Sequence, residues 1–164
     1  MNILILTERY WPENFPVINS LSLCLSKHHN ITVWTGRPNY PSGKIYKGYK
    51  HKNVYIEKYK SIEIIRIPNT PRKDGSTKNL IKSYFSFISN SFKYFKILDG
   101  KKIDIVFYYG VTPITTCIVG LYFKLRLKAK FVFWLQDVWP DSIKATGHIK
   151  NIFILNLIKI FISY

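Results

Sequence analysis

Acidic residues are scarce in this chain: 9 Asp and Glu stand against 25 Lys and Arg, and the formal net charge is +16. An excess of this size indicates an anionic partner, such as a lipid headgroup, a pyrophosphate or a nucleic acid. Arginine is scarce as well, at 5 of the 25 basic residues, and base recognition favours arginine over lysine. The composition therefore argues against nucleic acid, and a lysine-rich coding bias remains an alternative explanation of the charge.

Cysteine is nearly absent, since only Cys24 and Cys117 occur. They lie far apart, with no C-x-x-C motif and no spacing typical of metal ligands, and the four histidines form no ligand set either. We therefore predict no metal site. We expect two buried free thiols on apolar helix faces, as in a reducing cytoplasm.

Long apolar runs and targeting signals are also lacking. The most apolar stretch, 152–164, is interrupted by Asn156 and Lys159, and it falls short of the roughly 20 residues that span a bilayer. The N-terminus has neither the basic region nor the cleavage site of a signal peptide. We expect a cytoplasmic protein, with peripheral attachment at the inner face of the cell membrane as a further expectation.

Three motifs of common enzyme classes are missing. The first predicted strand is not followed by G-x-G-x-x-G, which counts against a dinucleotide oxidoreductase. No Walker lysine motif and no G-x-S-x-G occur, which counts against a P-loop enzyme and an α/β-hydrolase.

Short apolar segments alternate with amphipathic ones along the chain, which is long enough for one domain, 1–164, with a real core. The predicted strands are 2–7, 31–35, 54–59, 62–67, 103–108 and 131–135, and the predicted helices are 17–30, 80–98, 112–127 and a segment from residue 150. This order predicts an α/β fold, a Rossmann-like doubly wound parallel sheet. Ligands of such sheets bind outside the carboxyl ends of the strands, where the first strand lies beside the fourth.

The loops at that edge are 8–16, 109–112 and 136–142, and they hold four of the nine acids: Glu8, Glu13, Asp137 and Asp141. Carboxylates in such loops can accept hydrogen bonds from sugar hydroxyls or orient a reacting group. For Glu13 and Asp141, helix capping is the alternative explanation. The turn with Gly110 and Thr112 delivers a helix N-terminus to the same edge, where backbone N–H groups favour an anion such as a pyrophosphate.

Three segments resemble landmarks of family 4 glycosyltransferases, above all those that add N-acetylfucosamine or similar sugars in O-antigen, lipopolysaccharide or capsule synthesis. They are ILTERYWPENF at 5–15, TGRPNYPSGKIYKGY at 35–49 and FWLQDVWPDS at 133–142. The resemblance implies the N-terminal, acceptor-side domain of a retaining GT-B enzyme. Its substrates would be a nucleotide sugar and a polyprenyl-pyrophosphate-linked acceptor at an anionic membrane surface. The enzyme would need no cofactor.

The resemblance also implies roles for particular residues. Many relatives carry a His-Asp pair where this chain has Gln136 and Asp137, so these two are the expected catalytic residues, with Gln136 as a hydrogen-bonding group without acid–base capacity. The expected acceptor-binding residues are Tyr10, Glu13, Asn14, Gly110, Thr112 and Asp141. The common glycine-rich turn after the first strand is replaced by Glu13-Asn14-Phe15.

The nucleotide-sugar domain of such enzymes has two glutamates eight positions apart, and no glutamates here have that spacing. We therefore expect that the C-terminal domain is absent from these 164 residues. Two alternatives stay open: a truncated, inactive fragment of such an enzyme, and a basic membrane- or nucleic-acid-binding module.

Overall fold

The computed structural model describes residues 1–110 and 114–136. A six-stranded sheet with the order β3-β4-β2-β1-β5-β6 forms its centre. The strands are β1 (Asn2–Leu6), β2 (Asn30–Gly36), β3 (Tyr55–Tyr59), β4 (Ile62–Ile67), β5 (Ile105–Gly110) and β6 (Lys130–Leu135). The helices are α1 (Pro16–Leu25), α2 (Thr77–Tyr94) and α3 (Cys117–Leu127), with short 3-10 helices at Phe95–Leu98 and Ile114–Thr116.

The sheet is parallel except at β3, which pairs antiparallel with β4. Tyr59 pairs directly with Ile62, so only Lys60 and Ser61 join the two strands. A connection of two residues can join only antiparallel neighbours. The predicted Rossmann-like α/β fold is confirmed, and the expectation of a wholly parallel sheet is wrong for this one strand. Among the parallel strands, the first lies beside the fourth, β5, as predicted.

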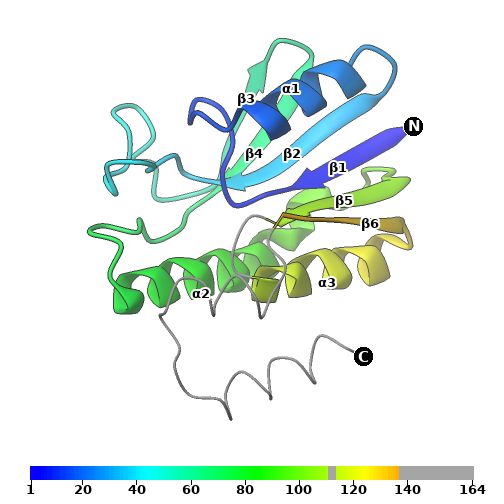
Figure 1. Cartoon of the computed structure of the whole chain (residues 1–164). Coiled ribbons are helices and arrows are strands. Elements are labelled where there is room, and N and C mark those ends of the chain that lie inside the picture. Colours follow the sequence, from blue (N-terminus) through cyan, green and yellow to red (C-terminus); the bar gives the residue numbers. More distant parts are fainter. Residues whose placement is uncertain (111–113, 137–164) are drawn as a thin grey trace.

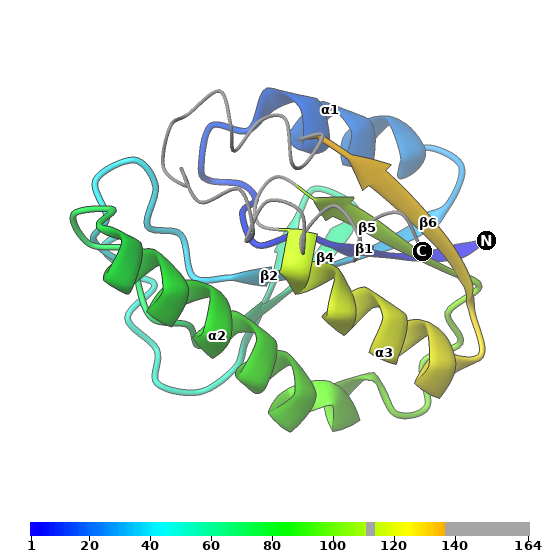
Figure 2. The same ribbon diagram turned by 60° about the horizontal axis from the view of Figure 1, so that its bottom comes forward.

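Helix α1 covers one face of the sheet, and α2 and α3 cover the other, as Figures 1 and 2 show. Alternate residues of β1 serve the two layers: Leu4 and Leu6 belong to the core under α2 and α3, whereas Ile3 and Ile5 belong to the core under α1. All four side chains are buried. The continuous apolar run of β1 follows from this position, because a strand covered on both faces has no solvent side.

A buried arginine connects the sheet to the loops at its carboxyl edge. Arg66, near the end of β4, is 1% exposed and forms an ion pair of 2.5 Å with Glu57 of β3. Its other guanidinium nitrogens donate to the backbone carbonyl of Gly36, at 3.2 Å, and to that of Trp11. The ring of Tyr49 lies 4.9 Å from the guanidinium carbon. One side chain therefore holds β3, the end of β2 and the loop after β1 in register with β4.

Most predicted boundaries agree with the structure to within a few residues. The helix predicted at 80–98 is divided into α2 and the 3-10 helix at Phe95–Leu98. The predicted helix start at residues 112–113 and the segment from residue 150 lie outside the described residues. Cys24 is exposed, because it lies on the side of α1 away from the buried Ile18 and Ser22. The expectation of a buried thiol is wrong there. No helix of the described residues is long and apolar enough to cross a membrane.

Candidate functional site

The loops that follow the parallel strands meet at the carboxyl edge of the sheet. The backbone N–H of Gly36, at the end of β2, donates to the carbonyl of Glu8 after β1, at 3.3 Å. The N–H of Gln136, after β6, donates to the carbonyl of Gly110 at the end of β5, at 3.1 Å. The chain leaves β1 and β5 toward opposite faces of the sheet, through α1 and α3. This is the switch point at which α/β sheets bind ligands.

Glu13 joins two of these loops. It is 2% exposed, and its Oε1 accepts hydrogen bonds from the backbone N–H groups of Asn39, at 2.8 Å, and Tyr40, at 2.7 Å. Its Oε2 accepts a third from the N–H of Tyr10, at 3.3 Å. Burial raises the pKa of the Glu13 carboxyl, although the bonds from Asn39 and Tyr40 act in the opposite direction. The carboxylate therefore fixes the loop after β1 against the loop after β2, and its predicted contact with an acceptor stays a prediction.

The other predicted acceptor-binding residues differ in accessibility. Tyr10 is fully buried, and its hydroxyl lies 2.5 Å from that of Ser22 on α1, whereas Asn14 in the same loop is exposed. Gly110 is buried at the end of β5, where an added Cβ would lie 2.6 Å from the ring of Tyr108. Only glycine fits this point of the backbone.

Of the two predicted catalytic residues, Gln136 is described and exposed at the end of β6. Asp137 lies outside the described residues, as do Thr112 and Asp141. The structure thus brings Gln136 next to Gly110 and groups Tyr10, Glu13 and Asn14 in one loop of the same edge.

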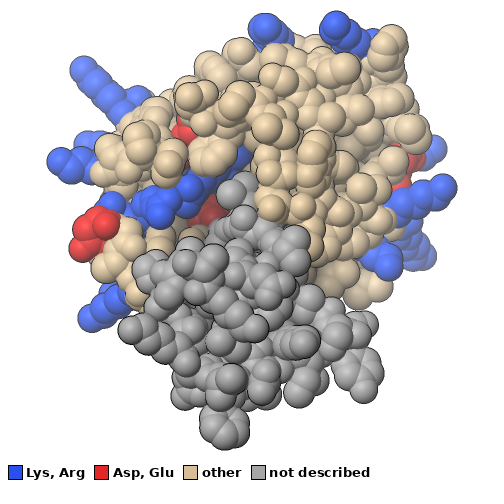
Figure 3. All heavy atoms as spheres, in the orientation of Figure 1, with Lys and Arg blue, Asp and Glu red and all other residues tan. Residues whose placement is uncertain are grey.

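Two arginines at this edge are not among the predicted site residues. Arg9 follows β1 and Arg72 precedes α2, and their guanidinium carbons lie 4.9 Å and 5.4 Å from the centroid of the Tyr40 ring. Figure 3 shows a recess on this face, over the loops that follow β1, β2 and β4, in which basic atoms lie beside acidic ones. The signal that could have found them is composition: of the five arginines in the chain, three stand in loops at this edge, namely Arg9, Arg37 and Arg72.

The carboxyl group of Glu8 interacts electrostatically with both arginines. Burial raises the pKa of its carboxyl to about 7, and the charge of Glu13 acts in the same direction. The charges of Arg9 and Arg72, and a hydrogen bond of 3.4 Å from the Ser83 hydroxyl, act against this shift. A carboxyl with such a pKa holds its proton for about half of the time at neutral pH.

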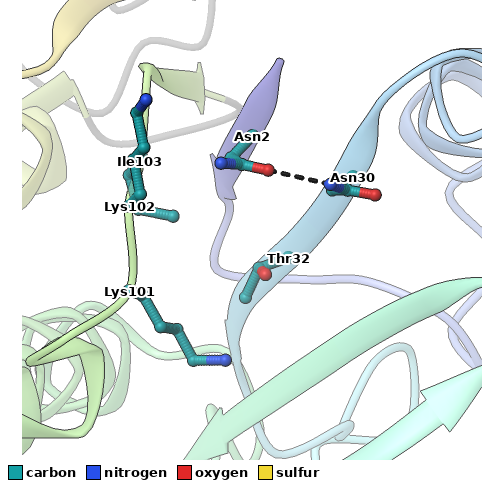
Figure 4. Close-up of a pocket in the computed structure, with 6 residues that line it drawn as sticks. All are labelled: Asn2, Asn30, Thr32, Lys101, Lys102 and Ile103. Carbon is teal, nitrogen blue, oxygen red and sulfur yellow. Dashed lines mark hydrogen bonds between the residues drawn. The ribbon is translucent and has the colours of Figure 1, made fainter.

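A second recess, of about 240 Å³, lies at the opposite edge of the sheet. Figure 4 shows it between the starts of β1 and β2 and the segment before β5, with Asn30 donating to Asn2 across a distance of 2.9 Å. The lining residues are Asn2, Asn30, Thr32, Lys101, Lys102 and Ile103. The only charged groups among them are the two lysines, and Lys101 is paired with Glu63 at 2.8 Å. This recess is therefore separate from the site at the carboxyl edge.

Within residues 1–110 and 114–136, no group of three or more His, Cys, Asp or Glu side chains could hold a metal ion. No protein-family model matches the sequence, and no curated protein matches it. One solved structure with a similar fold is described as "Trehalose-6-phosphate from E. coli bound with UDP-2-fluoro glucose". The identity is 11%, the TM-score is 0.47, and the match covers 85% of this chain and 34% of that chain. This chain therefore spans about a third of the matched protein, and the likeness is one of fold.

The first prediction concerns Glu13. Glu13→Ala leaves three N–H groups, those of Tyr10, Asn39 and Tyr40, without their acceptor, so we expect a loss of about 3 kcal/mol or more in the free energy of unfolding. Glu13→Gln keeps an oxygen for Asn39 and Tyr40 and should lose less than half as much. Urea denaturation of the three proteins measures both values. Equal losses in the two variants would contradict this account of the carboxylate.

The second prediction concerns the pH dependence of stability. The pKa of Glu8 is raised in the folded protein from 4.5 to about 7, so the unfolded chain ionises first as the pH rises. Stability should therefore fall between about pH 4.5 and 7, and Glu8→Gln removes this loss. We expect the free energy of unfolding of the variant to exceed that of the parent by about 3 kcal/mol at pH 8 and to match it near pH 4. Urea midpoints at several pH values test this, and a difference independent of pH would refute it.

Proposed function

We propose that this chain is the acceptor-side domain of a GT-B glycosyltransferase. The reaction would move a sugar from a nucleotide sugar to a polyprenyl-pyrophosphate-linked acceptor, in O-antigen, lipopolysaccharide or capsule synthesis. One observation carries the proposal: the described residues of the three segments that resemble family 4 glycosyltransferases, far apart in the sequence, lie at one edge of the sheet.

The first two segments contact each other directly, and the third begins at the same edge. Glu13 of the first segment accepts hydrogen bonds from Asn39 and Tyr40 of the second. The third segment begins in β6, and its Gln136 bonds to Gly110 beside the switch point. The loop residues of these segments take no part in pairing the strands, so their placement at the ligand-binding edge supports a shared function.

The resemblance to family 4 glycosyltransferases suggests a role for each residue. Gln136 and Asp137 would contact the transferred sugar, with the amide of Gln136 donating and accepting hydrogen bonds and Asp137 supplying negative charge. Tyr10, Glu13, Asn14, Gly110, Thr112 and Asp141 would surround the acceptor or hold the loops that do so. The donor would be held by a nucleotide-sugar domain outside these 164 residues.

The outer side of α2 suits attachment to an anionic membrane surface. Ile81, Phe85 and Phe92 are 61%, 70% and 37% exposed, and their spacing of four and seven residues places them in one stripe along the helix. Exposed lysines at 78, 82 and 93 lie along one flank of this stripe. In such an arrangement the apolar side chains can enter the membrane interface while the lysines bind anionic headgroups.

Helix α3 continues this surface on the same face of the sheet (Figure 2). Its exposed apolar residues are Ile118, Leu121 and Leu125, again on one side of the helix. The two helices meet where Phe92 packs edge-on against Tyr122, with their ring centroids 4.9 Å apart. A peripheral enzyme with this surface would hold its carboxyl edge near a lipid-linked acceptor.

The third prediction tests the transfer reaction. The full chain is assayed with a labelled nucleotide sugar and a polyprenyl-pyrophosphate-linked acceptor, alone and joined to the nucleotide-sugar domain of a family 4 enzyme. We expect transfer only in the joined form. Asp137→Asn should lower kcat by about tenfold or more if the carboxylate acts in the transition state.

The control for this assay is Asp99→Asn, an exposed aspartate after the 3-10 helix at Phe95–Leu98, which should leave kcat unchanged. Unchanged turnover in Asp137→Asn would exclude the assigned role. Absence of transfer in both forms would favour an inactive fragment, and salt-sensitive binding of nucleic acid by the chain would favour a basic binding module.

The fourth prediction tests the membrane surface. The double variant Ile81→Ser and Phe85→Ser should weaken partitioning to vesicles of phosphatidylglycerol by about tenfold, because it removes two side chains that would enter the interface. Val17→Ser is the matched control, since Val17 is an exposed apolar residue on α1, across the sheet. Vesicle sedimentation measures the effect. Equal binding to phosphatidylcholine vesicles, or equal loss in the control, would argue against this surface.

A further inference from the structure

We propose that Arg9 and Arg72 together bind a diphosphate group at the carboxyl edge of the sheet. The inference rests on the proposed function, because it names the ligand chemistry held at that same edge. The resemblance to family 4 assigns no role to either arginine, and the argument comes from the surroundings of the two guanidinium groups.

The two side chains converge on one aromatic ring from separate loops. Their guanidinium carbons lie 4.9 Å and 5.4 Å from the centroid of Tyr40, so the two groups are no further apart than the sum of these distances. The ring itself is held in place: the Tyr40 N–H donates to Glu13, and the ring of Phe15 packs 5.3 Å from it.

The loop that carries Arg72 is fixed to the same structure. The backbone N–H of Arg72 donates to Oδ1 of Asn39 at 3.2 Å, and Asn39 is itself bonded to Glu13 through its N–H. Arg9 stands one residue before Tyr10, whose N–H also donates to Glu13. A single buried carboxylate therefore holds together the loops that carry both arginines.

Neither guanidinium is neutralised within the part of the chain that the structure describes. No hydrogen bond and no ion pair of 4.0 Å or less joins the side chain of Arg9 or Arg72 to another described residue. Arg66 and Arg37 differ, since their guanidinium groups donate to a carboxylate or to backbone carbonyls. Within residues 1–110 and 114–136, two positive charges without a bonded partner thus lie at one edge of the sheet.

Glu8 cancels the charges of Arg9 and Arg72 only in part. Glu8 is bonded to the Ser83 hydroxyl at 3.4 Å, and burial raises its pKa to about 7, so it is neutral in about half of the molecules at neutral pH. The two arginines therefore keep part of their positive charge at this edge, and their planar groups bind oxyanions through paired N–H donors.

A diphosphate is the ligand class that matches two such groups. It carries at least two negative charges on two adjoining phosphate groups, so each guanidinium can bind one of them through two oxygens. A single carboxylate or a neutral sugar would leave at least one guanidinium without a counter-charge. The lysines elsewhere on the surface supply charge without this fork geometry.

The fifth prediction is a calorimetric titration of the full chain with inorganic pyrophosphate at low ionic strength. We expect one site, with Arg9→Gln and Arg72→Gln each raising Kd by about tenfold or more, since a charge-assisted bond is lost in each. Arg126→Gln is the matched control, because Arg126 lies on α3 against the rings of Phe95 and Tyr122, and its Kd should stay unchanged. Added salt should weaken binding in the parent.

Competition experiments show which class of molecule carries the bound diphosphate. Displacement of pyrophosphate by geranyl diphosphate but not by UDP would assign the site to a prenyl-linked ligand, and the reverse result would assign it to a nucleotide. Displacement by both also supports a diphosphate site. Displacement by neither, absence of pyrophosphate binding in the parent, or an equal loss in Arg126→Gln would overturn the proposal.

Two further variants keep the test decisive if a glutamine variant fails to fold. Arg9→Lys and Arg72→Lys keep the charge and the aromatic contact but lose the fork of donors, so each should still raise Kd by about threefold or more. Parent-like affinity in both would refute the paired-guanidinium site. Because this measurement requires no sugar transfer, pyrophosphate binding without turnover would leave the inference standing while the proposed function fails.

Discussion

A buried guanidinium, that of Arg66, determines where the loops at the carboxyl edge can lie. Removing a full charge from water costs several kcal/mol, and the protein recovers this cost only if every donor finds a partner. Here the partners come from β3, the end of β2 and the loop after β1. Any arrangement that moves one of these segments leaves a buried charge without its partner, so the loops are restricted to positions close to those observed.

The same logic explains why the edge is ordered by charges rather than by apolar packing. Glu13 uses one negative charge to bind three backbone N–H groups, and Arg66 uses one positive charge to bind two carbonyls and a carboxylate. The cis peptide bonds Trp11-Pro12 and Tyr40-Pro41 lie in the two loops so joined. Glu13 and Arg66 thus bond to groups inside the protein, whereas the guanidinium groups of Arg9 and Arg72 have no bonded partner within the part of the chain that the structure describes.

Much of the fold could be predicted from the sequence, because apolar periodicity reports burial directly. The run at Ile3–Leu6 indicates a strand covered on both faces, and the structure places β1 at the middle of the sheet. The antiparallel direction of β3 depends on how many residues join it to β4, which periodicity does not report. The exposure of Cys24 likewise depends on which side of α1 faces the sheet.

The candidate site was less accessible to such reasoning. Local sequence marks Glu13 as an acid in a loop, but its partners at Asn39 and Tyr40 are 26 and 27 residues away, and only the closed sheet brings them together. The convergence of Arg9 and Arg72 on Tyr40 has the same origin. Sequence patterns name the elements that carry a site, whereas the pairs formed between loops follow from tertiary packing.

The position of β1 also has a consequence for biosynthesis. The Asn2 N–H donates to the carboxylate of Asp104, 102 residues further along the chain, and β1 pairs with β5 on that side. During translation, the N-terminal strand can pair with β2 early, but its other edge has no partner until β5 has left the ribosome. One edge of an almost wholly apolar strand therefore stays open until about 110 residues have left the ribosome, an interval in which chaperones compete with self-association.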